Sequence, residues 1–231
     1  MKQLKTDITA CKSMLTQYCM PEWFPAIAAN RQWLQYKKGE QVFTEGENVT
    51  GMYFVQEGVV KVHKKWDDEK ELIIRFAKPG DIVGHRGLGV DNIYPVSGTA
   101  VDTVIVCYFD MAFFEATLKV NQLFLYELMM FFAAELKVSE RKMRNLAHMS
   151  VKARIAHTFL NLYHQFGLNK DGVIDIQLPR QDIAAYAGTT YETVFRIINE
   201  MTTQKLVEVN GKNIRLLDID GLERIIQSPV A

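Results

Sequence analysis

The apolar positions of the chain follow a period of two in its first half. Between residues 33 and 108 they form short runs broken by glycine, and alternate positions such as Met52 and Phe54, or Val60 and Val62, are apolar. This alternation with glycine punctuation is typical of half-buried antiparallel strands joined by tight turns. The pattern therefore predicts an antiparallel β-roll or barrel.

From residue 121 to residue 148 the period becomes helical, and the segment contains neither glycine nor proline. Apolar residues separated alternately by four and three positions form a heptad seam, interrupted only by Ser139, and its apolar members are Leu125, Met129, Phe132, Leu136, Met143 and Leu146. A second apolar stripe consists of Leu123, Phe124, Leu128 and Phe131. One stripe can cover the roll while the seam meets the same helix of a second copy, so we expect a parallel homodimer. The alternative is an amphipathic helix packed only on its own domain.

The segment after this helix predicts the order helix, strand, helix, turn, helix, hairpin. Ser150 can cap a helix that ends at Gly167. Two strand-like runs, VIDIQL at 173–178 and VEVNGKNIRLL at 207–217, bracket two further helices. The dipeptide Asn210-Gly211 in the second run is a strong hairpin signal.

The stretch LPRQDIAAYAGTTYETVFRI at 178–197 predicts a helix-turn-helix. Pro179 suits a first helical turn, Gly188 ends that helix, and Thr189 with Glu192 matches a capping box for the next one. The helical period buries Val194 and leaves an outward face that consists of Thr190, Tyr191, Glu192, Phe195, Arg196 and Asn199. In such motifs the second helix enters the DNA major groove, where arginine pairs with guanine and glutamate accepts from cytosine.

A purely structural explanation of the same residues is also open. Glu192 could serve only the helix cap, Arg196 could be its ion-pair partner, and Phe195 could be buried. The hairpin that follows and the dimer seam that precedes favour DNA binding, because a two-fold DNA site suits a two-fold protein.

Four stretches of the chain, taken in this order, resemble the cyclic-AMP receptor protein/Fnr (CRP/FNR) family of bacterial transcription regulators. They are KKGEQVFTEGENVTGMYFVQEGVVKV, KPGDIVG, NLAHMSVKARIAHTFLNL and RQDIAAYAGTTYETVFRI. The resemblance implies an α+β fold with an N-terminal antiparallel β-roll that is cyclic-nucleotide-binding-like and of jelly-roll type. It also implies a long dimerisation helix and a C-terminal winged helix-turn-helix. We expect the roll and an N-terminal helical segment in 1–120, the helix and hinge in 121–148, and the DNA-binding domain in 149–231.

This resemblance also implies roles for individual residues. Glu192 and Arg196 match a glutamate and an arginine that contact base edges, and Arg180 matches a position that contacts phosphate. The full DNA-binding candidate set is Arg180, Thr190, Tyr191, Glu192, Thr193, Phe195 and Arg196. Tyr191 and Phe195 depart from the best-known members, so only a GA-type core of the half-site is expected. The implied protein is no enzyme but a homodimeric, sequence-specific regulator that binds a palindromic operator in double-stranded DNA and contacts RNA polymerase.

The same comparison argues against cyclic AMP as the effector. Cyclic-AMP binders of the family hold the ribose with a glycine-glutamate pair and the cyclic phosphate with an arginine-serine pair. This chain has His85 at the glutamate, and Tyr94 and Pro95 at the arginine and serine. A buried phosphodiester without its arginine is poorly compensated. The effector-pocket candidates are Gly84, His85, Arg86, Gly87, Tyr94 and Pro95. Gly84, Arg86 and Gly87 could form an anion-binding nest or a plain turn.

Composition limits the remaining alternatives. Lys plus Arg and Asp plus Glu both number 27, so any basic surface must be local. The chain has three cysteines, Cys11, Cys19 and Cys107, which is an odd number without CxxC spacing. Three cysteines are too few for a four-cysteine iron–sulfur cluster, so we expect reduced thiols. A cyclic-nucleotide or haem/redox sensor of the same family stays open as an alternative, with haem held by a histidine such as His63 or His85 or by a methionine. A cupin-like metal enzyme is a further alternative, although no metal-ligand cluster is evident. No signal peptide or apolar span of about 20 residues is evident, so we expect a cytoplasmic protein without a membrane contact.

Overall fold

The computed structural model describes residues 1–3, 13–67 and 70–227. These residues form two compact units, Met1–Lys137 and Val138–Ala231. The long helix α4 (Gln122–His148) is continuous and contributes residues to both units. Cys11 lies outside the described residues.

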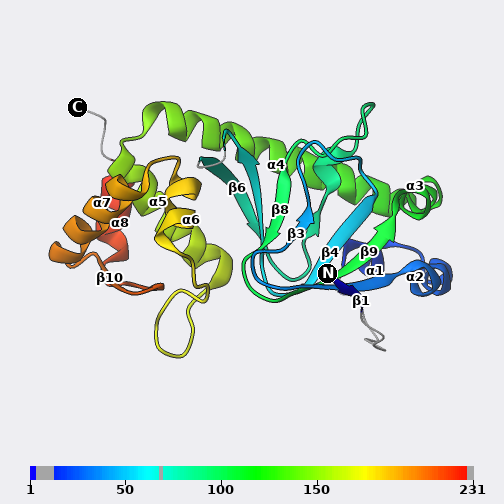
Figure 1. The fold of residues 1–231 in the computed structure, drawn as a ribbon, viewed down its shortest axis with the longest axis horizontal. Coiled ribbons are helices and arrows are strands. Elements are labelled where there is room, and N and C mark those ends of the chain that lie inside the picture. Colours follow the sequence, from blue (N-terminus) through cyan, green and yellow to red (C-terminus); the bar gives the residue numbers. More distant parts are fainter. Residues whose placement is uncertain (4–12, 68–69, 228–231) are drawn as a thin grey trace. The chain divides into compact units, whose positions relative to one another are not determined.

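The first unit is built on two antiparallel sheets, which Figure 1 shows as the strands of a roll. One sheet contains, in spatial order, β1 (Lys2–Gln3), β2 (Gln32–Tyr36), β9 (Val104–Asp110), β4 (Gly51–Glu57) and β7 (Ile82–Val83). The other contains β3 (Gln41–Phe43), β8 (Ser97–Ala100), β5 (Val60–Lys65) and β6 (Glu71–Ala77). The predicted antiparallel roll is thus confirmed, together with the α+β class.

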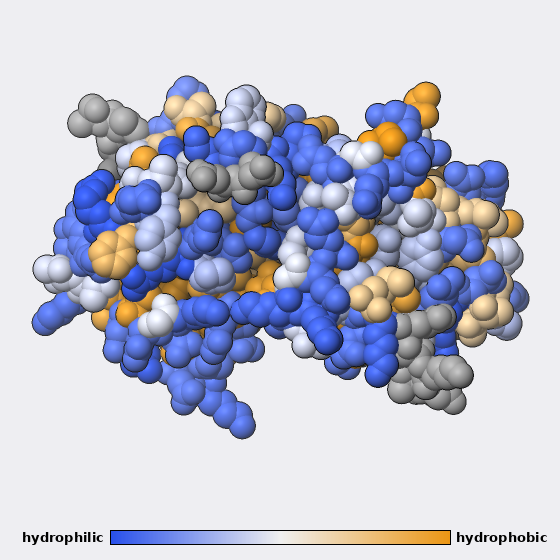
Figure 2. Space-filling model, in the orientation of Figure 1, coloured by the Kyte–Doolittle hydropathy of each residue, from blue (hydrophilic) through white to orange (hydrophobic). Residues whose placement is uncertain are grey.

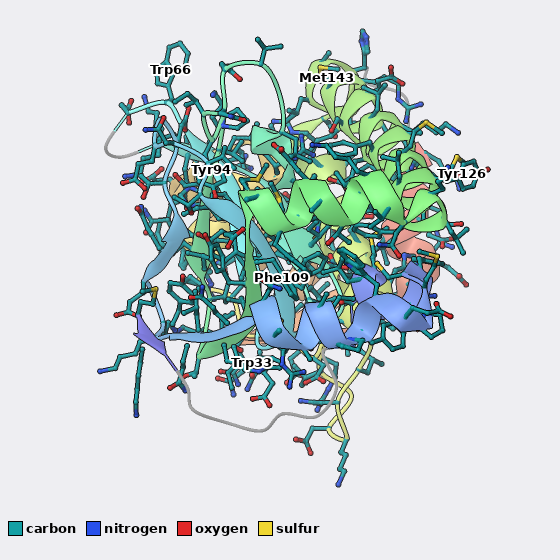
Figure 3. All side chains as sticks on the ribbon, turned by 90° about the vertical axis from the view of Figure 1, so that its right-hand side faces the viewer. Trp33, Trp66, Tyr94, Phe109, Tyr126 and Met143 are labelled. Carbon is teal, nitrogen blue, oxygen red and sulfur yellow. The ribbon has the colours of Figure 1, made fainter. Side chains whose placement is uncertain are left out.

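Strand β4 is buried on both faces. Tyr53 and Val55 pack in the core that β4 shares with strands of the second sheet, whereas Met52 and Phe54 pack in a second core against helices. The prediction of a half-buried strand is wrong here, because helices cover the face that would otherwise meet water. The covering elements are α1 (Met14–Tyr18), η1 (Pro21–Trp23), α2 (Phe24–Asn30), α3 (Met111–Val120) and the first turns of α4. Figure 3 labels Phe109, which belongs to this second core.

The second apolar stripe of α4 attaches the helix to the roll. Phe124 and Leu128 are buried in the helix-covered core, and Phe131 packs against it. The prediction that this stripe covers the roll is therefore confirmed for these three residues. It is wrong for Leu123, which is exposed.

The second unit contains α5 (Val151–Phe166), α6 (Arg180–Ala187), α7 (Tyr191–Thr203), the hairpin of β10 (Val207–Asn210) and β11 (Asn213–Leu216), and α8 (Ile219–Gln227). As predicted, Ser150 caps α5 by accepting a hydrogen bond from the backbone N–H of Ala153, and Gly167 ends the helix. The run VIDIQL does not form the predicted strand. Its Ile174, Ile176 and Leu178 are buried, and the Ile174 N–H donates to the Ile214 carbonyl over 2.8 Å. Burial of alternate side chains accounts for the strand-like pattern, while the backbone forms only an isolated bridge between Ile174 and Leu168 and this one bond to β11.

Glycine is required at two turns of this unit. The predicted hairpin is confirmed, but Asn210 pairs with Asn213, so the loop consists of Gly211 and Lys212, one residue later than predicted. Gly211 has φ of 61°, and glycine at the first loop position suits a two-residue hairpin. Gly188 ends α6 with φ of 65° and ψ of 48°. This left-handed conformation turns the chain between α6 and α7.

Substitution of Gly188 tests the backbone requirement of this turn. Gly188→Ala should lower the free energy of unfolding of the second unit by about 1 kcal/mol, because a side chain is disfavoured in the left-handed region. Gly188→Asn should cost less, since asparagine tolerates this conformation. Urea unfolding followed by circular dichroism measures both variants. Equal losses for alanine and asparagine would show that φ does not govern the turn.

Candidate nucleic-acid interface

The start of α7 is held by two threonines. Thr190 is the N-cap, and its hydroxyl accepts a hydrogen bond of 3.3 Å from the Thr193 backbone N–H and lies 3.1 Å from the Thr193 hydroxyl. The predicted capping box of Thr189 and Glu192 is wrong, because the helix starts one residue later and the Thr189 N–H donates to the Ala184 carbonyl. The Glu192 carboxylate is therefore not used by the cap.

The two faces of α7 differ as its period predicts. Its buried side comprises Val194, Ile197, Ile198 and Met201. Its exposed side comprises Tyr191, Glu192, Phe195, Arg196 and Asn199. Within the described residues Glu192 has no hydrogen bond or ion pair, so the alternative in which Arg196 is its partner is not realised. The carboxylate and the guanidinium thus lie one helical turn apart on the outward face without pairing with each other.

Lys152 anchors the far end of α7. Its ammonium nitrogen lies 2.6 Å from a carboxylate oxygen of Glu200. This hydrogen bond lowers the pKa of Glu200, and the charge of Arg196 lowers it further. Arg196 therefore lies close enough to Glu200 to interact with it electrostatically, while its side chain stays exposed.

The first residue of α6 reaches across to the exposed face of α7. The guanidinium carbon of Arg180 lies 5.1 Å from the ring centroid of Phe195, which is a cation–π distance. Phe195 is 44% exposed, so the alternative in which it is a core residue is wrong. The structure brings Arg180, Phe195 and Arg196 to one side of the helix-turn-helix.

An arginine on α5 joins the end of α4 to the helix-turn-helix turn. The Arg154 side chain donates to the carbonyls of Ala187 over 3.0 Å and Gly188 over 3.2 Å. It also donates to the carbonyls of Met149 over 3.0 Å and Leu146 over 3.4 Å. Burial lowers the pKa of this guanidinium, which satisfies carbonyl groups that two helix ends leave unpaired. Arg154 was not identified from the sequence, because α5 also carries other polar residues such as Lys152 and His157, and nothing in the local pattern distinguishes this arginine from them.

In the roll, the two residues at the predicted phosphate position do not share a pocket. Tyr94 is 2% exposed, its hydroxyl donates to the Gly51 carbonyl over 3.0 Å, and its ring centroid lies 4.7 Å from that of Phe43. Figure 3 shows Tyr94 within the roll. Pro95 is exposed, and its carbonyl accepts a hydrogen bond of 2.9 Å from Lys64.

The remaining effector-pocket candidates form a closed turn. Gly84 is left-handed and precedes the 3-10 turn η2 (His85–Gly87). The Gly87 N–H donates to the Gly84 carbonyl, and the Leu88 N–H donates to the His85 carbonyl. These two N–H groups are therefore used within the turn rather than presented to an anion.

Glu135 of α4 binds two arginines of the roll. Its carboxylate oxygens lie 3.0 Å from Arg75 and 2.9 Å from Arg86. Arg75 also lies 3.5 Å from Asp81 and donates to the Ile82 carbonyl. We call Arg75, Glu135 and Arg86 the ion triad. It links β6 and the η2 turn to α4.

His85 is buried against the same segment of α4. Its ring centroid lies 5.0 Å from that of Phe131 and 5.3 Å from that of Phe132. Burial, and then the charges of Arg75 and Arg86, lower the pKa of His85 to about 3. The ring is therefore neutral at physiological pH. One of the predicted effector candidates thus contacts one of the predicted dimer residues, Phe132.

The dimer seam lies on the outward side of α4. The exposed members are Leu125, Met129, Phe132, Leu136 and Met143, whereas Leu146 is half-buried. Hydrophilic residues cover most of the face of the molecule in Figure 2. Exposed apolar residues at regular spacing along one helix therefore differ from the usual surface composition.

Comparisons with known proteins agree with this geometry. Residues 33–121 match the cyclic nucleotide-binding domain, and residues 153–225 match the Crp-like helix-turn-helix domain. The cAMP-activated global transcriptional regulator CRP of Salmonella typhimurium is 31% identical over 186 residues, which cover 78% of this chain and 87% of that protein. The chain belongs to the CRP/FNR family.

Other CRP/FNR relatives extend the same similarity. The transcriptional activator protein FnrA of Stutzerimonas stutzeri is 28% identical over 80% of this chain and 77% of that protein. The structure of FixK2 from Bradyrhizobium japonicum superposes with a TM-score of 0.76 at 24% identity, over 87% of this chain and 99% of that one. The chain is thus a transcription regulator with a helix-turn-helix DNA-binding domain and an effector-type roll, as its sequence predicts.

Among the described residues of this CRP/FNR protein, the histidine and cysteine side chains considered for haem, metal or redox chemistry are mostly buried or already have polar neighbours. His63 lies 2.8 Å from the Thr99 hydroxyl and 2.7 Å from a Glu71 carboxylate oxygen, so both ring nitrogens have close polar neighbours. Cys19 and Cys107 are buried, and burial raises the pKa of Cys19 to about 12, which disfavours its thiolate. In the described parts of the chain no group of three or more His, Cys, Asp and Glu could hold a metal ion. Nor is any described helix both long and apolar enough to cross a bilayer.

Burial of neutral His85 should make the first unit less stable in mild acid. Between the ordinary histidine pKa of about 6.5 and about 3, only the unfolded chain binds the proton, so stability falls as pH falls. From pH 7.5 to 5.5 the wild-type protein should lose about 1 kcal/mol more than His85→Leu. Urea unfolding at both values, monitored in the roll by near-ultraviolet circular dichroism, measures the difference. Equal losses in the two proteins would contradict burial of an uncharged ring.

Proposed function

We propose that this protein acts as a homodimer that binds a palindromic operator, with α7 of each protomer in the major groove. The observation that carries the proposal is the outward face of α7, where Glu192 and Arg196 are exposed and free of each other. Arginine and glutamate suit guanine and cytosine, respectively, in adjacent base pairs. Half-sites should be centred about one helical turn apart.

Other residues of the motif have distinct proposed roles. Arg180, at the start of α6, contacts a backbone phosphate, while Thr190 and Thr193 hold the first turn of α7 and present their hydroxyls to the DNA. Tyr191 is 48% exposed at the first position of α7 and contacts the flank of the half-site. Phosphate contacts set the register, and base contacts provide the sequence preference.

The seam of α4 provides the proposed dimer contact. Leucine and methionine side chains that are about 60% exposed, such as those of Leu136 and Met143, become buried when two seams pair. A heptad spacing favours this pairing over a general apolar surface. The roll of 1–120, the helix of 121–148 and the winged helix of 149–231 would then act as sensor, dimer contact and DNA-binding domain.

The proposed regulatory role resembles that of the relatives in transcription but not in the effector. FnrA is named a transcriptional activator, which supports a contact of this protein with RNA polymerase at the operator. CRP is named cAMP-activated, but here the buried Tyr94 and the neutral His85 replace the groups that would hold cyclic AMP. We infer that any effector of the roll differs from cyclic AMP, and that the protein regulates transcription without catalysing a reaction.

Two arginine variants separate base contacts from phosphate contacts. On an operator selected from a random library, Arg196→Ala should cost about 1 to 3 kcal/mol and relax the preference at one base pair. Arg180→Ala should weaken binding to all duplexes alike and reduce the slope of log affinity against log salt by about 1. Fluorescence anisotropy over a salt series measures both effects. Equal affinity of the wild-type protein for every duplex would refute sequence-specific binding.

One helix substitution tests the dimer. Leu136→Glu should yield monomers, because two buried carboxylates would face each other across the seam. Leu136 is preferred to Phe132, since Phe132 also contacts His85 within its own protomer. The matched control is Val138→Glu, which alters an exposed apolar residue of the same helix away from the seam. Sedimentation equilibrium should show monomers for the first variant and dimers for the second, and a dimeric Leu136→Glu protein would exclude the seam.

A further inference from the structure

Phe195 is an apolar side chain where polar groups would be expected. It lies between Glu192 and Arg196 along the outward face of α7, yet 44% of it is exposed. Positions three residues apart are neighbours on a helix, so Glu192 adjoins this ring on the helix surface, while Arg196 follows it directly in the sequence and is also exposed. Nothing within the fold requires this ring to be on the surface, because α7 already buries Val194 and Ile198.

The ring is also fixed in place from one side. The guanidinium of Arg180 lies over it at 5.1 Å, and Arg180 belongs to the preceding helix. A guanidinium in this position is attracted by the electron-rich face of the ring. Phe195 therefore links Arg180 on α6, the proposed phosphate contact, to α7, which carries the proposed base contacts.

The major groove offers one apolar group to such a ring. Guanine, cytosine and adenine present donors and acceptors there, whereas thymine adds its C5-methyl group. A phenyl ring cannot replace the hydrogen bonds that a polar base edge loses when water leaves. Tyr191, the other exposed aromatic residue at this end of α7, carries a hydroxyl that can pair with polar edges.

We propose that Phe195 determines specificity by contacting a thymine methyl beside the bases that Glu192 and Arg196 contact, while the same ring positions Arg180 at a phosphate. This inference rests on the proposed function, since it assumes that α7 enters the major groove. The operator should therefore contain a thymine next to its core, because only thymine presents a methyl group to the Phe195 ring.

Replacement of thymine by uracil removes only the methyl group and tests the contact directly. In the operator selected by the wild-type protein, each half-site thymine is changed to uracil one position at a time, in both half-sites together. At one position wild-type affinity should fall about fourfold per half-site, which corresponds to one methyl-sized group returned to water. Phe195→Ala should bind the thymine and uracil operators equally, and Phe195→Leu should keep part of the difference. Fluorescence anisotropy at fixed salt measures all three proteins.

The outcomes separate this inference from the function on which it rests. A wild-type protein that selects an operator but shows no methyl-sensitive thymine, or a Phe195→Ala protein that keeps the sensitivity, overturns the methyl contact while specific binding stands. A wild-type protein that selects no operator removes the proposed function, and this inference with it.

A double-mutant cycle tests the second role of the ring. If Phe195 positions Arg180, then Arg180→Ala should reduce affinity and salt slope less in the Phe195→Leu protein than in the wild-type protein. Phe195→Leu keeps an apolar side chain, so the cycle isolates the cation–π contact. Additive losses would show that Arg180 reaches its phosphate without help from Phe195.

Discussion

Helix α4 carries two apolar stripes, and the roll of its own protomer covers only one of them. Phe124 and Leu128 are buried in the roll, whereas Leu136 and Met143 are exposed. Because exposed leucine and methionine in a regular seam are costly in water, the second copy that we propose would cover them with its own α4. Glu135, the neighbour of Leu136 in the sequence, binds the two arginines of the ion triad.

Apart from Thr190, the groups that stabilise the helix-turn-helix differ from those proposed to contact DNA. Thr190 caps α7, Val194 and Ile198 anchor it in the core, and Arg154 holds the turn between α6 and α7. None of these roles uses the Glu192 carboxylate. Because mostly different residues stabilise the fold and contact DNA, substitutions on the outward face can change the preferred DNA sequence without a loss of stability.

The roll of this protein follows the family fold, and its interior is closed by aromatic packing. Tyr94 packs against Phe43, and the Tyr94 hydroxyl donates to a backbone carbonyl. His85 is held neutral between the ion triad and the aromatic rings of α4. These internal contacts are the reason for our proposal that any effector differs from cyclic AMP.

The sequence by itself predicted the roll, the long helix, the helix-turn-helix and its hairpin, because periods of two and of 3.5 and the turn glycine Gly188 act over a few neighbouring residues. It did not predict α3 or α8. It could not decide which threonine caps α7, or that VIDIQL lacks a partner strand, since both depend on packing. The triad joins Glu135 to Arg86, which is 49 positions away, and to Arg75, which is further away still, and the Arg180–Phe195 contact spans two helices. Such contacts form only when the chain folds, so the tertiary structure alone showed how the candidate sites are assembled.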